Sequence, residues 1–227
     1  MANELKGAFE IIFSLEREFL SAVGLSLKVS LIALFLAAII AIPFGIWVGT
    51  GKFKHRELTS AILNTAMSFP TVVIGLLLYS FFSRKGPMGN LGILFTPAAM
   101  ITGQCILAFP IIAALVAAGT RNLGDRAILA ARALGAGNIK SILLFLKESR
   151  LIVLASLSAA FGRIFSEVGI SMMLGGNIRF YTRNITTAIA LETSKGAFSL
   201  GIALGMVLMV IAFTINASVY YLQPKKI

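Results

Sequence analysis

Two opposite charges four residues apart are the side chains in this sequence with the clearest capacity for chemistry. Arg163 and Glu167 lie in an otherwise apolar stretch, and on a helix an i, i+4 pair shares one face. Ionisable groups inside a membrane segment usually face the protein interior or a wet cavity and mark a pathway. Two hypotheses stay open: the pair lies on a translocation path, or it clamps helices without meeting substrate. Glu167 carries a negative charge and would repel an anion, so it is not expected to bind one directly.

Other kinds of reaction chemistry lack the residues they need. The nearest approach to a nucleotide-binding loop is GTGKF at 49–53, but position 46 is Ile and Phe53 has no hydroxyl to hold a metal ion. His55 is the only histidine and Cys105 the only cysteine, so the sequence predicts neither a metal site nor a disulfide. We therefore expect a chain with no catalytic residues and no cofactor of its own.

The elements that position the charged pair are apolar segments long enough to cross a membrane. The chain has 227 residues, 58% of them hydrophobic and only 13% charged, which is too few charges to cover a water-facing surface. This composition excludes a soluble enzyme, a nucleic-acid binder and a secreted disulfide scaffold. It predicts an all-α polytopic membrane protein, a single domain over 1–227, with five spans at about 24–50, 60–82, 93–118, 151–174 and 199–222.

The distribution of basic residues predicts the orientation of these spans. Segments 51–59 and 119–150 and the C-terminal tail hold eleven Lys and Arg, against seven on the other side. The positive-inside rule then places the C-terminus in the cytoplasm and the N-terminus outside. Residues 1–20, with apolar side chains at helical spacing, predict a short amphipathic helix on the outer interface.

The segment 175–198 is too polar to span and is predicted to be an extracytoplasmic loop. Gly175 and Gly176 permit an unusual turn before Asn177, and the hydroxyls of Thr186 and Thr187 could line a gate. The basic side chains Arg179, Arg183 and Lys195 would attract anions to this segment. The alternative is a loop that only touches a binding protein.

The 119–150 segment is too long for a plain turn between spans. Residues 128–134 favour a helix, Gly135 and Gly137 interrupt it, and an apolar pattern resumes at 139–146. A short helix followed by a glycine-containing turn at the cytoplasmic surface predicts a docking element. The alternative is an interfacial helix that binds no partner.

The string LAARALGA at 129–136 resembles the E-A-A-x3-G signature of ABC importer permeases, with Leu129 in place of Glu. In that family this loop is a coupling helix that fits a cleft in a separate cytoplasmic ATPase. The resemblance assigns coupling to seven residues: Leu129, Ala130, Ala131, Arg132, Leu134, Gly135 and Ala136.

Several further strings resemble the molybdate, tungstate and sulfate permeases. Three of them are FGRIFSEVG at 161–169, GGNI at 175–178 and TTAI at 186–189. Four strings are most similar to the tungstate branch: SFPTVVIGLLLY at 68–79, SRKGPMGNLGILFTP at 83–97, LKESR at 146–150 and TTAIALETSKGAF at 186–198. This resemblance implies a type I importer permease fold. It also implies that the path or gate is formed by Arg163, Glu167, Gly175, Gly176, Asn177, Thr186 and Thr187.

The same resemblance implies an assembly in a prokaryotic inner membrane. The expected partners are a second copy of this chain, two cytoplasmic ATPases that carry ATP and Mg²⁺, an extracytoplasmic oxyanion-binding protein and membrane lipid, with no nucleic acid. The predicted function is ATP-driven import of an oxyanion, tungstate first, by alternating access. Molybdate or sulfate as cargo stays open, as does an ATP-independent channel or scaffold.

Overall fold

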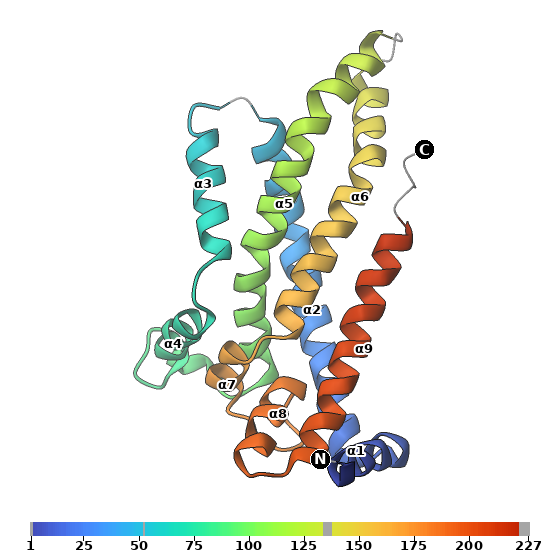
Figure 1. Cartoon of the computed structure of the whole chain (residues 1–227). Helices are drawn as coiled ribbons and strands as arrows, with labels where there is room; N and C mark the ends of the chain where they lie inside the picture. Colours follow the sequence, from blue (N-terminus) through green and yellow to red (C-terminus); the bar gives the residue numbers. More distant parts are fainter. Residues whose placement is uncertain (1, 52, 134–137, 223–227) are drawn as a thin grey trace.

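The fold is a bundle of long helices with short helices collected at one end (Figure 1). The computed structural model describes residues 2–51, 53–133 and 138–222. In these ranges there is no strand, so the all-α prediction is confirmed. The long elements are α2 (Arg17–Thr50), α5 (Pro97–Ala133), α6 (Asn138–Phe165) and α9 (Phe198–Leu222). The shorter elements are α1 (Ala2–Ser14), α3 (Arg56–Met67), α4 (Thr71–Phe82), the 3₁₀ turn η1 (Gly89–Leu91), α7 (Gly169–Gly175) and α8 (Ile185–Ser194).

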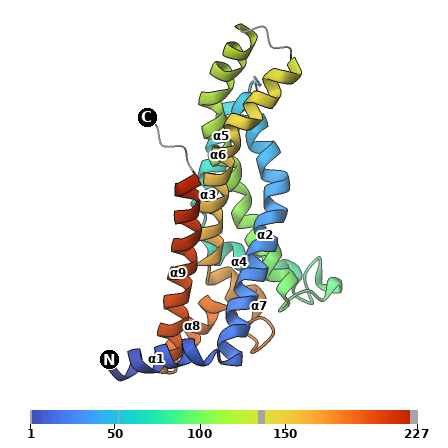
Figure 2. The same ribbon diagram turned by 90° about the vertical axis from the view of Figure 1, so that its right-hand side faces the viewer.

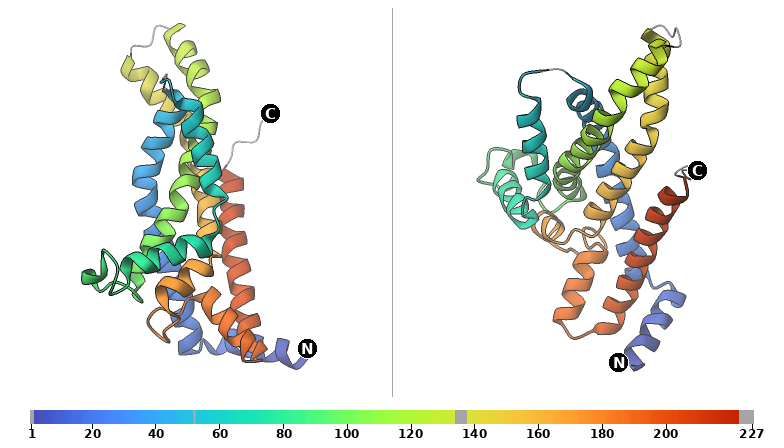
Figure 3. Two further views of the ribbon diagram at one scale, coloured as in Figure 1. Left: turned by 90° about the vertical axis from the view of Figure 1, so that its left-hand side faces the viewer. Right: turned by 45° about the horizontal axis from the view of Figure 1, so that its top comes forward.

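The membrane passes are a mixture of straight and broken helices. Within the described residues, α2, α5 and α9 are each long and apolar enough to cross a bilayer, whereas α3 with α4 bends by 93° and α6 with α7 bends by 59°. Counting each bent pair as one span gives the five predicted passes. The predicted spans over 60–82 and 151–174 are therefore each formed by two helices rather than one. Pro70, which has no N–H to donate, precedes α4 and helps to end the helical run there, and α4 lies across the bundle axis (Figure 3).

The packing of α2 against α5 forms the centre of the core. A Cβ added at Gly45 or Gly49 would lie 2.7 Å from a backbone carbonyl oxygen of α5, so only glycine allows this approach. The Gly45-x3-Gly49 spacing thus places both glycines against α5. The same spacing at Gly201 and Gly205 makes no such contact, because a Cβ at Gly205 would meet nothing within 4 Å inside the protomer, and one at Gly201 only Thr193 at 3.6 Å.

The segment predicted as a cytoplasmic loop is largely helical. Helix α5 continues without a break to Ala133, and α6 begins at Asn138. The prediction of a separate helix that starts at Ile128 is therefore wrong, because residues 128–133 form the last turns of a spanning helix. Leu134, Gly135 and Ala136 of the predicted coupling set lie outside the described residues.

The two ends of the bundle are distinct (Figures 1 and 2). Helices α1, α7 and α8 gather at one end, and the extensions of α5 and α6 form the other. Helix α1 lies across the start of α9, where Ser199 donates a hydrogen bond to Glu4. Helix α2 begins at Arg17, earlier than the predicted span. The C-terminal end of α9 points toward the α5–α6 end of the bundle, so the two chain termini lie toward opposite ends, as five passes require. Which end faces the cytoplasm stays a prediction.

Candidate functional site

The Arg163–Glu167 pair lies at the break between α6 and α7. Arg163 Nη1 is 2.8 Å from Glu167 Oε2, so the predicted ion pair is present. The two residues do not share a helix, however, because α6 ends at Phe165. Glu167 is only 3% exposed, whereas the Arg163 side chain is 43% exposed. The other carboxylate oxygen accepts a hydrogen bond from the Ile170 N–H at 3.3 Å. Glu167 therefore caps the first turn of α7 while it holds the end of α6.

A buried polar network joins this break to α8. Asn184 forms a capping box with Thr187: its side chain accepts from the Thr187 N–H at 2.9 Å, and the Thr187 hydroxyl accepts from the Asn184 N–H at 3.1 Å. The Asn184 amide also donates to Ser171 on α7 at 3.0 Å. The Thr186 hydroxyl lies 2.9 Å from the backbone oxygen of Glu167, in position to donate to it.

The two threonines of the predicted gate are therefore buried and engaged inside the protein. Thr186 is 4% exposed and Thr187 is fully buried. The N–H of Ile185 donates to Ser26 of α2 at 2.8 Å, which ties the start of α8 to a third helix. Movement of α6 or α7 must therefore change hydrogen bonds around the α8 N-terminus.

The turn after α7 places the predicted glycines and Asn177. Gly176 has φ +69° and Asn177 has φ +52°, both in the left-handed region that Gly and Asn tolerate. Thr182 stabilises the turn, since its hydroxyl donates to the Gly175 carbonyl and accepts from the Ile178 N–H. Asn177 Oδ1 is buried and has no hydrogen-bond partner among the described residues.

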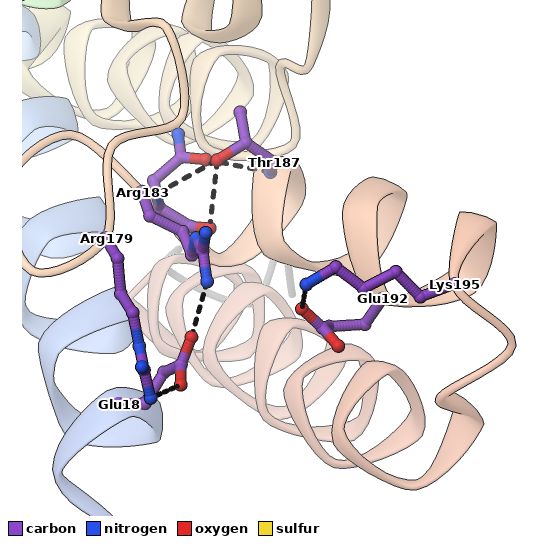
Figure 4. Close-up of polar contacts among 7 residues, drawn as sticks. Glu18, Arg179, Arg183, Thr187, Glu192 and Lys195 are labelled. Carbon is purple, nitrogen blue, oxygen red and sulfur yellow. Dashed lines mark hydrogen bonds and ion pairs between the residues drawn. The ribbon is translucent and has the colours of Figure 1, made fainter.

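The basic residues of the outer segment are paired with carboxylates (Figure 4). Arg179 and Arg183 both bind Glu18 at the start of α2, and Lys195 Nζ lies 3.0 Å from Glu192. Glu192, predicted to lie in a loop, is in α8 and is only 8% exposed. The expected attraction for a dianion is therefore reduced by these carboxylates.

A positive surplus nevertheless remains at this mouth. Arg17 lies over the Phe180 ring at 5.5 Å, and Arg179 lies over the same ring at 4.9 Å. Arg179 and Arg183 therefore share the single Glu18 carboxylate, while Arg17 forms no ion pair with a carboxylate among the described residues. The cluster retains a net positive charge and fixes the outer segment to the start of α2.

The predicted coupling residues lie far from this cluster. Leu129, Ala130, Ala131 and Arg132 are in the last turns of α5, beyond its apolar span. Helix α6 connects the two regions, since its 28 residues extend about 42 Å at 1.5 Å per residue. The structure brings Glu167, Thr186 and Thr187 together and keeps the coupling segment at the opposite end.

Sequence reasoning missed three members of the network. Glu18, Ser26 and Ser171 carry no local pattern that links them to residues up to 165 positions away. Asn184 did carry a signal, because Asn three residues before Thr187 at the start of an apolar run is typical of a helix N-terminus. Among the described residues, no group of His, Cys, Asp and Glu could hold a metal ion.

Comparison with known proteins gives consistent matches. Residues 41–227 match the family described as "Binding-protein-dependent transport system inner membrane component". The chain is 38% identical to the tungstate uptake system permease protein TupB of Peptoclostridium acidaminophilum over 99% of both chains. It is 40% identical to the TupB of Campylobacter jejuni, covering 93% of this chain and 88% of that one. A chain of the inward-facing methionine ABC transporter MetNI shares the fold, with TM-score 0.66 at 19% identity over 91% of this chain and 97% of that one.

Proposed function

The chain belongs to the family of binding-protein-dependent transport system inner membrane components, and we propose that it is the permease of an ATP-driven importer whose cargo is tungstate. The observation that carries this proposal is the identity of 38% and 40% to two tungstate permeases across nearly the whole chain. A cluster with surplus positive charge at one end of the bundle is consistent with an anionic cargo.

The proposed assembly is a homodimer of this chain with two cytoplasmic ATPases and an extracytoplasmic oxyanion-binding protein. ATP and Mg²⁺ are bound and used on the ATPases, and this chain holds no cofactor. The α5–α6 end contacts the ATPase, and the end formed by α1, α7 and α8 faces the binding protein. A reporter fused after Ile227 should therefore report the cytoplasm, and an extracytoplasmic signal would invert this orientation.

The proposed mechanism is alternating access with α6 as the mechanical link. Closure of the ATPases displaces the α5–α6 end, and the continuous α6 transmits this displacement to its other end. There the Arg163–Glu167 pair and the Thr186 hydrogen bond connect α6 to α7 and α8. A change in the angle at this break would open the path outward, and ATP hydrolysis would reset it.

The test of cargo is the elemental content of cells with and without the gene, supplied with low tungstate and molybdate together. We expect loss of tungsten in the deletion strain and recovery on complementation, measured by mass spectrometry. Loss of molybdenum as well would withdraw the assignment to tungstate and retain an oxyanion permease. Sulfate would be the next candidate if neither metal changed, because all three anions are tetrahedral dianions with similar hydrogen-bond acceptors.

A substitution in the predicted coupling segment distinguishes an ATP-driven transporter from an ATP-independent channel. Gly135→Trp should uncouple ATP hydrolysis from transport in the reconstituted transporter while the complex still assembles. Unchanged flux in this variant would favour the channel. Arg84→Trp, at the opposite end of the bundle, is the matched control and should retain coupling.

A further inference from the structure

A polar cavity lies at the end of the bundle opposite to the paired charges of the outer segment. It has a volume of about 240 Å³ and lies between the end of α2, residues of α3 from Arg56 to Asn64 and the middle of α5. The charged and polar lining comes from Arg56, Ser60, Asn64 and Arg121. Small residues of α5 form the opposite wall and leave the space open: Ala114, Ala117 and Ala118.

The charge balance of this cavity is positive. Arg121 is paired with Glu57 through Nη2 at 2.7 Å and Nη1 at 3.4 Å, but that carboxylate is 74% exposed and is not part of the cavity lining. Arg56 has no carboxylate partner among the described residues. It donates to the last carbonyls of α2 instead, to Val48 at 3.0 Å and to Gly49. Two guanidinium groups therefore border the cavity, and only that of Arg121 is paired with a carboxylate.

The donors around this cavity are those that recognise a tetrahedral oxyanion. A guanidinium presents several N–H groups in a plane and forms short, charge-assisted hydrogen bonds with such anions. The Ser60 hydroxyl and the Asn64 amide are neutral donors on the same face of α3. The volume accommodates one tetrahedral oxyanion with part of its water shell.

The cavity lies beside a side chain typical of the membrane interface. Trp47 directly precedes the lining residue Val48, stacks on Phe53 with ring centroids 4.4 Å apart, and is 52% exposed. Tryptophan concentrates at the level of the lipid headgroups. An anion can therefore reach the cavity either from the water or as the phosphate of an anionic lipid.

We propose that this α2–α3–α5 cavity is an anion site that binds one tetrahedral oxyanion between Arg56 and Arg121. The anion is a free oxyanion or a lipid headgroup phosphate, and it neutralises the two guanidiniums where α3 packs on α5. The site is separate from the outer cluster and does not require tungstate to be the cargo.

Trp47 is the only tryptophan of the chain and directly precedes the lining residue Val48, so its fluorescence reports on the end of α2 that borders the cavity. The full-length permease, purified in an uncharged maltoside detergent, is titrated with sodium tungstate and with sodium phosphate. Arg121→Gln removes one guanidinium, and Ala118→Leu fills the cavity without changing charge. Arg84→Gln removes the same charge at the other end of the bundle and is the matched control. Size-exclusion chromatography and thermal unfolding establish that each variant is folded.

We expect a saturable fluorescence change in the wild type and in Arg84→Gln. In Arg121→Gln the affinity should fall about tenfold or more, because one hydrogen bond between charged groups is lost. In Ala118→Leu the binding should vanish. If the titrations are flat, native mass spectrometry that shows phosphatidylglycerol retained by the wild type and lost by both cavity variants assigns the site to a lipid phosphate. Flat titrations without selective lipid retention, or cavity variants that bind like the wild type, would overturn the proposal.

Discussion

The Arg163–Glu167 pair gives a prediction in which the two single variants differ in size. Arg163→Ala leaves the Glu167 carboxylate, 3% exposed, without its cation. Breaking a buried pair from one side costs about 3–5 kcal/mol; because the Arg163 side chain is 43% exposed, we expect the lower end, about 3 kcal/mol. Glu167→Ala instead leaves the Ile170 N–H without an acceptor, which should lower the free energy of unfolding by about 1–3 kcal/mol. The Arg163 side chain can then turn to water.

The double variant separates charge from packing. The double variant, with both Arg163→Ala and Glu167→Ala, carries neither charge. It should be no less stable than Glu167→Ala alone and more stable than Arg163→Ala alone. Thermal unfolding can be followed with a thiol-reactive dye, because Cys105 is the only cysteine and is partly buried. We expect the Tm to rank in the order wild type, double variant, Arg163→Ala.

The comparison pair is Glu192 with Lys195, three residues apart, with side chains 10% and 51% exposed. Because the Glu192 carboxylate is also largely buried, Lys195→Ala should likewise cost more stability than Glu192→Ala. Glu167→Ala should also reduce transport more than Glu192→Ala, because only Glu167 joins two helices. A double variant as unstable as Arg163→Ala would refute the reasoning, since it would mean that the stranded charge contributes nothing.

Substitutions at four further positions test the helix packing, the outer cluster and the buried network around α8. Gly49→Ala should lower the free energy of unfolding by about 1–3 kcal/mol, because its Cβ would overlap α5. Gly205→Ala should lower the Tm little or raise it, because its site is open within the protomer. Measurements of Tm check both variants. Glu18→Gln should cost about 1 kcal/mol and speed trypsin cleavage at its two arginine partners; an unchanged digest would contradict the tether. Thr186→Val should cost about 1 kcal/mol through the lost hydrogen bond to the Glu167 carbonyl, and Thr186→Ser should restore the Tm.

The five passes could be predicted because each depends on local composition. Runs of about 20 apolar residues are visible without any tertiary information. The Arg163–Glu167 contact was predicted from i, i+4 spacing, and it is present although Glu167 lies beyond the end of α6. The spacing remained sufficient because a helix end and the next turn keep such residues near one another.

The breaks and the long-range pairs could not be predicted in the same way. Pro70 predicts a disturbance, but the 93° angle depends on how α4 packs on α7, where Gly75 meets Met173. The binding of Arg179 and Arg183 to Glu18 joins positions more than 160 residues apart, and no periodicity encodes it. The burial of Thr186 likewise follows from the packing of α8 on α2 and α7, so exposure could not be deduced from residue type.

The length of α2 links the conformation of the protein to the thickness of its bilayer. Its 34 residues measure about 51 Å, and exposed apolar side chains extend from Leu20 to Trp47, whereas the hydrocarbon layer is about 30 Å thick. The helix must tilt, or the lipid around it must thicken, at a cost that depends on the mismatch. Any step that changes the tilt of α2 therefore also deforms lipid, and longer or shorter acyl chains should shift the balance between inward- and outward-facing states.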